Sequence, residues 1–182
     1  MHRLIIIVAL LIATPALANT EIVVDRAAHT LTLSKDGATI ETYDVILGKK
    51  STPTPAFETT FKTIDINPVW HPTAKSIREL RKHPELINHY GVLFTDHGVY
   101  APAGIKNPLG KARLNLEYSI KVIRIHGTSQ PELFDTTGRN YSSGCVRVLH
   151  IKELVEQLVV DNIDWDRSYT IKLAEPVHVS VR

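Results

Sequence analysis

Cysteine is nearly absent from this 182-residue chain, in which Cys145 is the single example. A lone thiol cannot form an internal disulfide, so it pairs with another chain, packs as an inert core residue, or reacts. The cysteine count alone does not separate these possibilities. The residues that flank Cys145 do.

An excess of either charge is also lacking, because 21 basic residues face 19 acidic ones and no basic block or stripe stands out. This balance argues against nucleic acid and against electrostatic binding to a membrane. A zinc site would need a tighter grouping of ligands than the scattered histidines offer: His71, His83, His89 and His97. We therefore expect no metal site and no cofactor.

A long apolar run is missing as well. The run at the start of the chain, Leu4 to Ala13, falls well short of the ~20 residues that a spanning helix needs. It follows His2 and Arg3 and precedes Pro15-Ala16-Leu17-Ala18, whose small-x-small pattern suits signal peptidase. We predict that residues 1–18 are a secretory signal peptide. Because no cysteine stands directly after the cleavage site, we expect no lipoprotein anchor, and we expect no other membrane anchor after cleavage.

Residues 19–182 have the length of one domain and show no repeat, low-complexity tract or linker. Runs rich in β-branched residues, divided by turn formers, predict strands at 22–24, 30–33, 40–47, 57–66, 118–125 and 168–173. Thr73 and Pro84 suit the starts of two short helices, the second ended by Gly91, and helical spacing of apolar residues predicts a third over 151–159. The pattern predicts one mainly β domain with a few helices.

Two glycine-marked segments carry the candidate chemistry. The first is an apolar strand that ends in His126 and Gly127, and the second contains Ser143-Gly144-Cys145. The segment between them is mostly polar and prone to turns, so it can loop out. We therefore expect the two strand ends to lie side by side.

Acyl transfer by a thiol needs a base for its proton, a group that orients the base, and donors for the oxyanion of the tetrahedral intermediate. His126 can supply the base, and a carbonyl near Gly127 can fix its tautomer. The absence of a Cβ at Gly144 permits a tight turn, in which the amides of Gly144 and Cys145 converge. Each residue also has a structural interpretation, since a strand-end histidine is usually a satisfied polar residue and Arg147 more often makes an ion pair than a substrate contact.

These two motifs resemble the signature of the L,D-transpeptidase catalytic domain, also called the YkuD domain. Other blocks follow in that family's order over nearly all of residues 19–182: Ile22-Val23-Val24-Asp25 with Leu31, Asp36-Gly37 and Val45 to Gly48, then Thr52-Pro53-Thr54-Pro55, Asn67-Pro68-Val69-Trp70 and Asn107-Pro108-Leu109-Gly110. Several weak matches in the right order are more specific than a cysteine motif alone. The resemblance implies a β-sandwich-like domain.

The resemblance also implies a reaction. Cys145 attacks a peptidoglycan tetrapeptide stem at its third residue, a diamino acid, expels D-alanine, and passes the acyl group to an amine, a step in cell-wall biogenesis and cell shape. By position His126 matches the base, Gly127 the base-orienting main chain, and Gly144 with Cys145 the oxyanion amides. Substrate contacts are expected from polar residues around the two motifs: Thr128, Ser143 and Arg147.

One position departs from the family pattern. Most members have histidine immediately before the glycine of the cysteine motif, and this chain has Ser143. A branch that resembles larger cell-wall transpeptidases shares Ser-Ser-Gly-Cys, so we interpret Ser143 as a subgroup variant. A mechanism that uses a second histidine at this place is not expected.

The sequence does not identify the acceptor of the acyl group. Amine acceptors include the stem diamino acid, the lysine of an outer-membrane lipoprotein and a free D-amino acid. Water would make the protein an L,D-carboxypeptidase or a hydrolase of peptidoglycan-linked peptides, and a wall-binding module with an inert Cys145 is the non-enzymatic alternative. We expect the protein to meet peptidoglycan stems in the periplasm or cell envelope.

Overall fold

The computed structural model describes residues 19–118 and 123–182. The predicted signal peptide lies outside these residues, as does the middle of the strand predicted at 118–125. Within the described ranges, no helix combines the length and the hydrophobicity that crossing a membrane requires.

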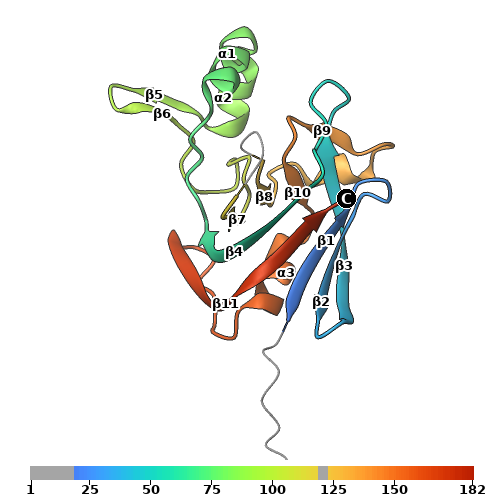
Figure 1. The fold of residues 1–182 in the computed structure, drawn as a ribbon. Coiled ribbons are helices and arrows are strands. Elements are labelled where there is room, and N and C mark those ends of the chain that lie inside the picture. Colours follow the sequence, from blue (N-terminus) through green and yellow to red (C-terminus); the bar gives the residue numbers. More distant parts are fainter. Residues whose placement is uncertain (1–18, 119–122) are drawn as a thin grey trace, which may run out of the picture.

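Most of the domain is one sheet that closes on itself (Figure 1). Its order is β10-β8-β7-β4-β11-β1-β2-β3-β9, and β10 pairs with β3 as well as with β8, which joins the two sides of the sheet. The strands are β1 (Thr20–Asp25), β2 (Thr30–Lys35), β3 (Ala38–Gly48), β4 (Phe57–Ile66), β7 (Ala112–Leu116), β8 (Ile125–His126), β9 (Asn140–Ser142), β10 (Val146–Val148) and β11 (Tyr169–Val181). The prediction of a mainly β, sandwich-like domain is confirmed.

The core lies inside the closed sheet. Along β4, Phe61, Ile64 and Ile66 are buried, and exposed or half-buried residues stand between them, as expected when one face of a strand meets the core. Helix α3 (Ile151–Leu158) adds its apolar face, Ile151, Leu154 and Val155, to the same core. The helix predicted over 151–159 is confirmed, one residue shorter than expected.

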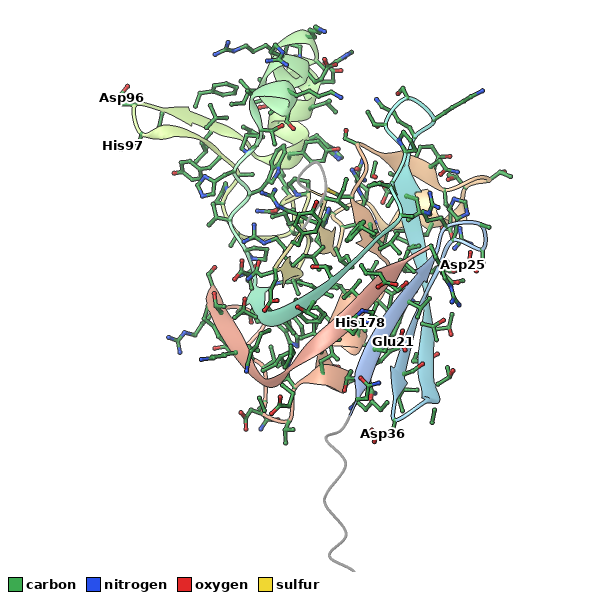
Figure 2. The ribbon with its side chains drawn as sticks, in the orientation of Figure 1. Glu21, Asp25, Asp36, Asp96, His97 and His178 are labelled. Atoms are coloured by element: carbon green, nitrogen blue, oxygen red, sulfur yellow. The ribbon has the colours of Figure 1, made fainter. Side chains whose placement is uncertain are left out.

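A helical lobe stands apart from the sheet (Figure 1). It contains α1 (Ala74–Lys82), α2 (Pro84–Tyr90) and the hairpin of β5 (Leu93–Thr95) and β6 (Gly98–Tyr100), whose tip carries Asp96 and His97 (Figure 2). Thr73 caps α1 by accepting a hydrogen bond from the Ser76 amide at 3.2 Å, and Gly91 ends α2 in a left-handed conformation. Both predicted helices are confirmed.

Two strand predictions need correction. Tyr118 lies in a bend, β8 begins only at Ile125, and the preceding strand is β7, which the alternation of buried Ala112 and Leu114 with polar neighbours would have indicated. The strand predicted at 168–173 continues to Val181. Its pairing with β4 shifts register between Lys172 and Val177 and then resumes, so the break there is a local irregularity and not an end.

Candidate active site

The candidate base ends β8, and the candidate nucleophile immediately precedes the neighbouring strand β10. β10 runs parallel to β8, with Val146 opposite Ile125 and Arg147 opposite His126. Val146 and Ile125 are buried in the core, so the side chains of Arg147, His126 and Cys145 belong to the other side of these strands. The prediction that the two strand ends lie side by side is confirmed.

His126 is held as a neutral imidazole of one tautomer. Its Nδ1 lies 2.7 Å from the carbonyl oxygen of Gly127, and because that oxygen can only accept, Nδ1 carries the proton. Burial, and after it the cation of Arg147, lower the pKa of His126 to about 3, against the opposing effect of the Gly127 hydrogen bond. Nε2 is therefore unprotonated, and the imidazole can accept a proton there.

Cys145 is protonated in the resting site. The side chain is half-buried, and burial raises the pKa of its thiol, while a hydrogen bond from the Arg124 backbone and the cations of Arg124 and Arg147 oppose that rise. Among the described residues no hydrogen bond joins the thiol to the His126 imidazole. Such contacts often form only when substrate is bound. The resting pair is thus a thiol and a neutral imidazole.

The turn before Cys145 is fixed by the hydroxyl of Ser142. This hydroxyl donates to the Cys145 carbonyl at 2.6 Å and accepts from the Gly144 amide at 3.0 Å. The Gly144 N–H, which we expected to meet the oxyanion, thus donates to Ser142 in this structure. The Cys145 amide has no hydrogen-bond acceptor among the described residues, so it remains the available donor.

The loop that contains Thr54 stabilises the turn before Cys145. Thr54 is buried, and its hydroxyl donates to the Gly144 carbonyl and accepts from the Gly48 amide, both at 2.9 Å. Gly144 has φ +117°, and a Cβ there would meet Ile123 Cδ1 at 2.7 Å, so only glycine fits. Gly48 is equally constrained, since its Cβ would lie 2.2 Å from the Thr52 carbonyl oxygen.

The polar residues expected to contact substrate lie in different surroundings. Ser143 is exposed, whereas the Thr128 hydroxyl accepts from the Gln130 amide at 3.0 Å and so orders the chain after the histidine motif. Arg147 is half-buried, and its Nη1 donates to Gln130 Oε1 at 3.3 Å. The same oxygen accepts from the Tyr90 hydroxyl at 3.1 Å, which connects α2 to the site.

Sequence reasoning missed the residues that support the site. Ser142, Thr54 and Gln130 all act through side-chain oxygens. Ser142 stood in the cysteine motif and Thr54 in a family-like Thr-Pro block, but only the fold shows which groups these oxygens meet. Gln130 had no signal, because its partners lie 40 and 17 residues away in the sequence. Among the described residues there is no cluster of three or more His, Cys, Asp or Glu suited to a metal ion.

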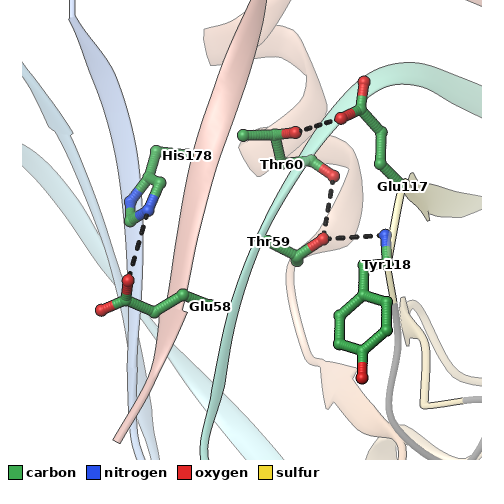
Figure 3. Close-up of a pocket in the computed structure, with 6 residues that line it drawn as sticks. All are labelled: Glu58, Thr59, Thr60, Glu117, Tyr118 and His178. Atoms are coloured by element: carbon green, nitrogen blue, oxygen red, sulfur yellow. Dashed lines mark hydrogen bonds and ion pairs between the residues drawn. The ribbon is translucent and has the colours of Figure 1, made fainter.

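A separate hollow of about 300 Å³ lies on another part of the surface (Figure 3). Its walls are Glu58, Thr59, Thr60, Glu117, Tyr118 and His178. His178 stands 3.9 Å from Glu21 and 4.0 Å from Glu58, with all three side chains well exposed (Figures 2 and 3). Exposed pairs at such distances add little stability. The hollow contains none of the candidate catalytic residues.

The fold and the site thus define a cysteine–histidine site on a closed, mainly β domain. The model of the L,D-transpeptidase catalytic domain, YkuD, matches residues 19–179. This chain belongs to that family, which is a family of acyltransferases acting as L,D-transpeptidases.

Individual relatives agree with this assignment. A Haemophilus influenzae protein assigned as an L,D-transpeptidase is 27% identical over 163 aligned positions, which cover 76% of this chain and 33% of that protein, so the chain spans about a third of its curated relative. An L,D-transpeptidase from Mycobacterium smegmatis has a TM-score of 0.52 at 19% identity, covering 91% of this chain and 59% of the other. L,D-transpeptidase 3 from Mycobacterium tuberculosis has a TM-score of 0.52 at 14% identity, covering 91% and 61%. These two structures show the same fold.

Proposed function

We propose that this protein forms a Cys145 thioester with a peptidoglycan tetrapeptide stem, releases D-alanine and transfers the acyl group to an amine. The observation that carries this proposal is the His126 imidazole, held by the Gly127 carbonyl as the tautomer with an unprotonated Nε2 and paired with Arg147, two residues after Cys145, on the neighbouring strand. Membership of the L,D-transpeptidase family supports the choice of substrate.

The proposed acylation begins when Nε2 of His126 takes the thiol proton and sulfur attacks the carbonyl carbon of the third stem residue. The resulting oxyanion accepts a hydrogen bond from the Cys145 amide. When the intermediate collapses, the bond to D-alanine breaks and the leaving nitrogen takes the proton from His126. The products are free D-alanine and a thioester on Cys145.

The second half repeats this chemistry in reverse. An acceptor amine attacks the thioester carbonyl, His126 takes the amine proton, and that proton returns to sulfur as the thiol leaves. A new amide joins donor and acceptor. Burial raises the pKa of the Cys145 thiol and lowers that of His126, so both groups start the cycle neutral.

We further propose that residues 1–18 direct export and are removed, which would place the domain in the periplasm or cell envelope together with its peptidoglycan substrate. The proposed acceptors are the diamino acid of a second stem and, alternatively, the lysine of an outer-membrane lipoprotein.

Product analysis with purified muropeptides tests the proposed function. Incubation with tetrapeptide stems is expected to yield cross-linked dimers together with free D-alanine. Tripeptide stems without dimers would show that water is the acceptor and that the protein is a carboxypeptidase. Unchanged stems with an inert thiol would instead favour a wall-binding module.

A carbapenem is expected to acylate Cys145, because it presents a strained carbonyl to the same nucleophile. Intact mass spectrometry should show one inhibitor mass added per chain in the wild-type protein and none in the Cys145→Ala variant. Adducts of equal yield in that variant would place the reactive group elsewhere in the chain.

Ser143→His is expected to be tolerated. Ser143 is exposed, and the proposed proton transfers do not use its hydroxyl. Acylation by the stem should stay within about twofold of the wild-type rate, the range expected of a surface substitution away from the reacting atoms. Single-turnover kinetics provide the check, and a loss of tenfold or more would mean that Ser143 has a role in the reaction.

A further inference from the structure

Arg147 keeps an uncompensated positive charge next to the nucleophile. Among the described residues no carboxylate lies within 4.0 Å of its guanidinium, which instead donates to the neutral amide of Gln130 at 3.3 Å. Arg124, the residue whose backbone contacts the Cys145 thiol, likewise has no acidic partner in the described ranges. Cys145 therefore stands in a positive field.

Arg113, on the other side of His126, differs from Arg147 in this respect. Arg113 lies opposite His126 on β7, and its guanidinium forms an ion pair with the carboxylate of Asp65. The charge of Arg113 is thus compensated on one side of His126, whereas that of Arg147 is left available on the other side. A guanidinium that has no counterion and lies beside a reaction site can bind an anionic group of the substrate.

The orientation of the Gln130 amide follows from its two partners. A guanidinium can only donate, so the amide oxygen, and not its nitrogen, faces Arg147. The Tyr90 hydroxyl then donates to that same oxygen at 3.1 Å. Thr128 fixes the backbone of Gln130. One oxygen atom therefore ties the arginine at the site to the last residue of α2 in the helical lobe.

We propose that Gln130 is a positioning residue that determines specificity: it anchors the Arg147 guanidinium to the helical lobe without neutralising it, so that the site selects acyl donors with a carboxylate next to the scissile bond. This inference rests on the proposed function, in which the leaving D-alanine carries that carboxylate. Glutamate at position 130 would still accept hydrogen bonds from Tyr90 and Arg147, but its negative charge would neutralise the guanidinium.

Alkylation of Cys145 tests the inference without any enzymatic turnover. The reagents are iodoacetate and iodoacetamide. In both reagents the thiolate sulfur displaces iodide from the CH₂ carbon and forms an S–C bond. The two reagents differ in charge, because only iodoacetate carries a carboxylate. Because Cys145 is the sole cysteine, every thiol adduct reports on this site. In the wild-type protein the ratio of the two rates, iodoacetate over iodoacetamide, should exceed that of N-acetylcysteine measured under the same conditions.

Gln130→Glu should lower this ratio by about 3- to 10-fold, since a second charge within several ångströms changes the local potential by that order. The matched control is Gln157→Glu, which adds the same charge at an exposed position on α3 and should leave the ratio unchanged. If Gln130→Glu fails to give a cooperative thermal melt, Gln130→Met replaces it. Methionine releases the guanidinium from its anchor, so the ratio should fall in the same direction.

Stem substrates provide the second measurement. The wild-type protein should prefer stems that end in D-alanine to stems that end in D-alaninamide, and Gln130→Glu should reduce this preference while Gln157→Glu preserves it. A wild-type protein that releases no D-alanine would contradict the proposed function, and the alkylation ratio would still decide the role of Gln130. Ratios in Gln130→Glu and Gln130→Met equal to that of the wild type would overturn the inference.

Discussion

Replacing Cys145 with alanine is expected to reduce D-alanine release from tetrapeptide stems by roughly 10⁴-fold or more, the scale of loss when a covalent nucleophile is removed. Neither the His126 imidazole nor the Cys145 amide can replace sulfur as the atom that bonds to the acyl group. The effect should therefore be complete within the sensitivity of a D-alanine assay.

The fold should survive this substitution. Cys145 is half-buried, and the turn around it is held by Ser142 and Thr54, which the substitution leaves in place. We expect a loss of about 1 kcal/mol in unfolding free energy at most, measured by thermal melting. Ser143→Ala serves as the matched control and should retain activity. An alanine variant at position 145 that released D-alanine at the wild-type rate would refute the assignment of the nucleophile.

His126→Ala is expected to slow acylation by about 10²–10⁴-fold, the usual contribution of a positioned general base. His126→Gln should be as slow, because glutamine can donate to the Gly127 carbonyl but offers no basic nitrogen. The measurement is single-turnover acylation, with a thermal melt to confirm that each variant is folded. His150→Ala removes an exposed histidine and should leave the rate unchanged.

The pH dependence of the wild-type rate distinguishes this base from an ordinary histidine. Because the pKa of His126 is lowered to about 3, the base stays unprotonated as the pH falls through 6.5. Acylation should lose no rate through histidine protonation between pH 7 and pH 5. Normal acylation by His126→Ala together with failure of Ser143→Ala would mean that a different group serves as the base.

The fold could be predicted from sequence where local pattern and tertiary packing agree. β4 matches its predicted bounds because its apolar residues alternate along the strand and one face meets the core. At the described ends of the strand predicted at 118–125, only Ile125 is in a strand, because β-branched composition is a weaker signal than the alternation of buried and polar residues that marks β7. β11 ran past its predicted end because pairing with β4 carries it through an irregularity.

The sequence could predict those contacts of the site that join residues adjacent in the chain, but not those that depend on side-chain direction or on the tertiary fold. The hydrogen bond between His126 and the Gly127 carbonyl joins adjacent residues, so the motif itself contained it. The role of the Gly144 amide could not be foreseen, because the hydroxyl of Ser142 competes for it in a way that depends on side-chain direction. The link from Tyr90 through Gln130 to Arg147 is formed by the tertiary fold alone.

The most direct test of the central claim is the intact mass of the protein after incubation with tetrapeptide stems, with and without an amine acceptor. Without acceptor, we predict a covalent adduct with the mass of the stem less D-alanine, located on Cys145. Addition of the acceptor should discharge the adduct, regenerate the free protein and yield the cross-linked peptide. Release of D-alanine with no adduct on Cys145 in rapidly quenched samples, or an adduct that persists in Cys145→Ala, would contradict the account.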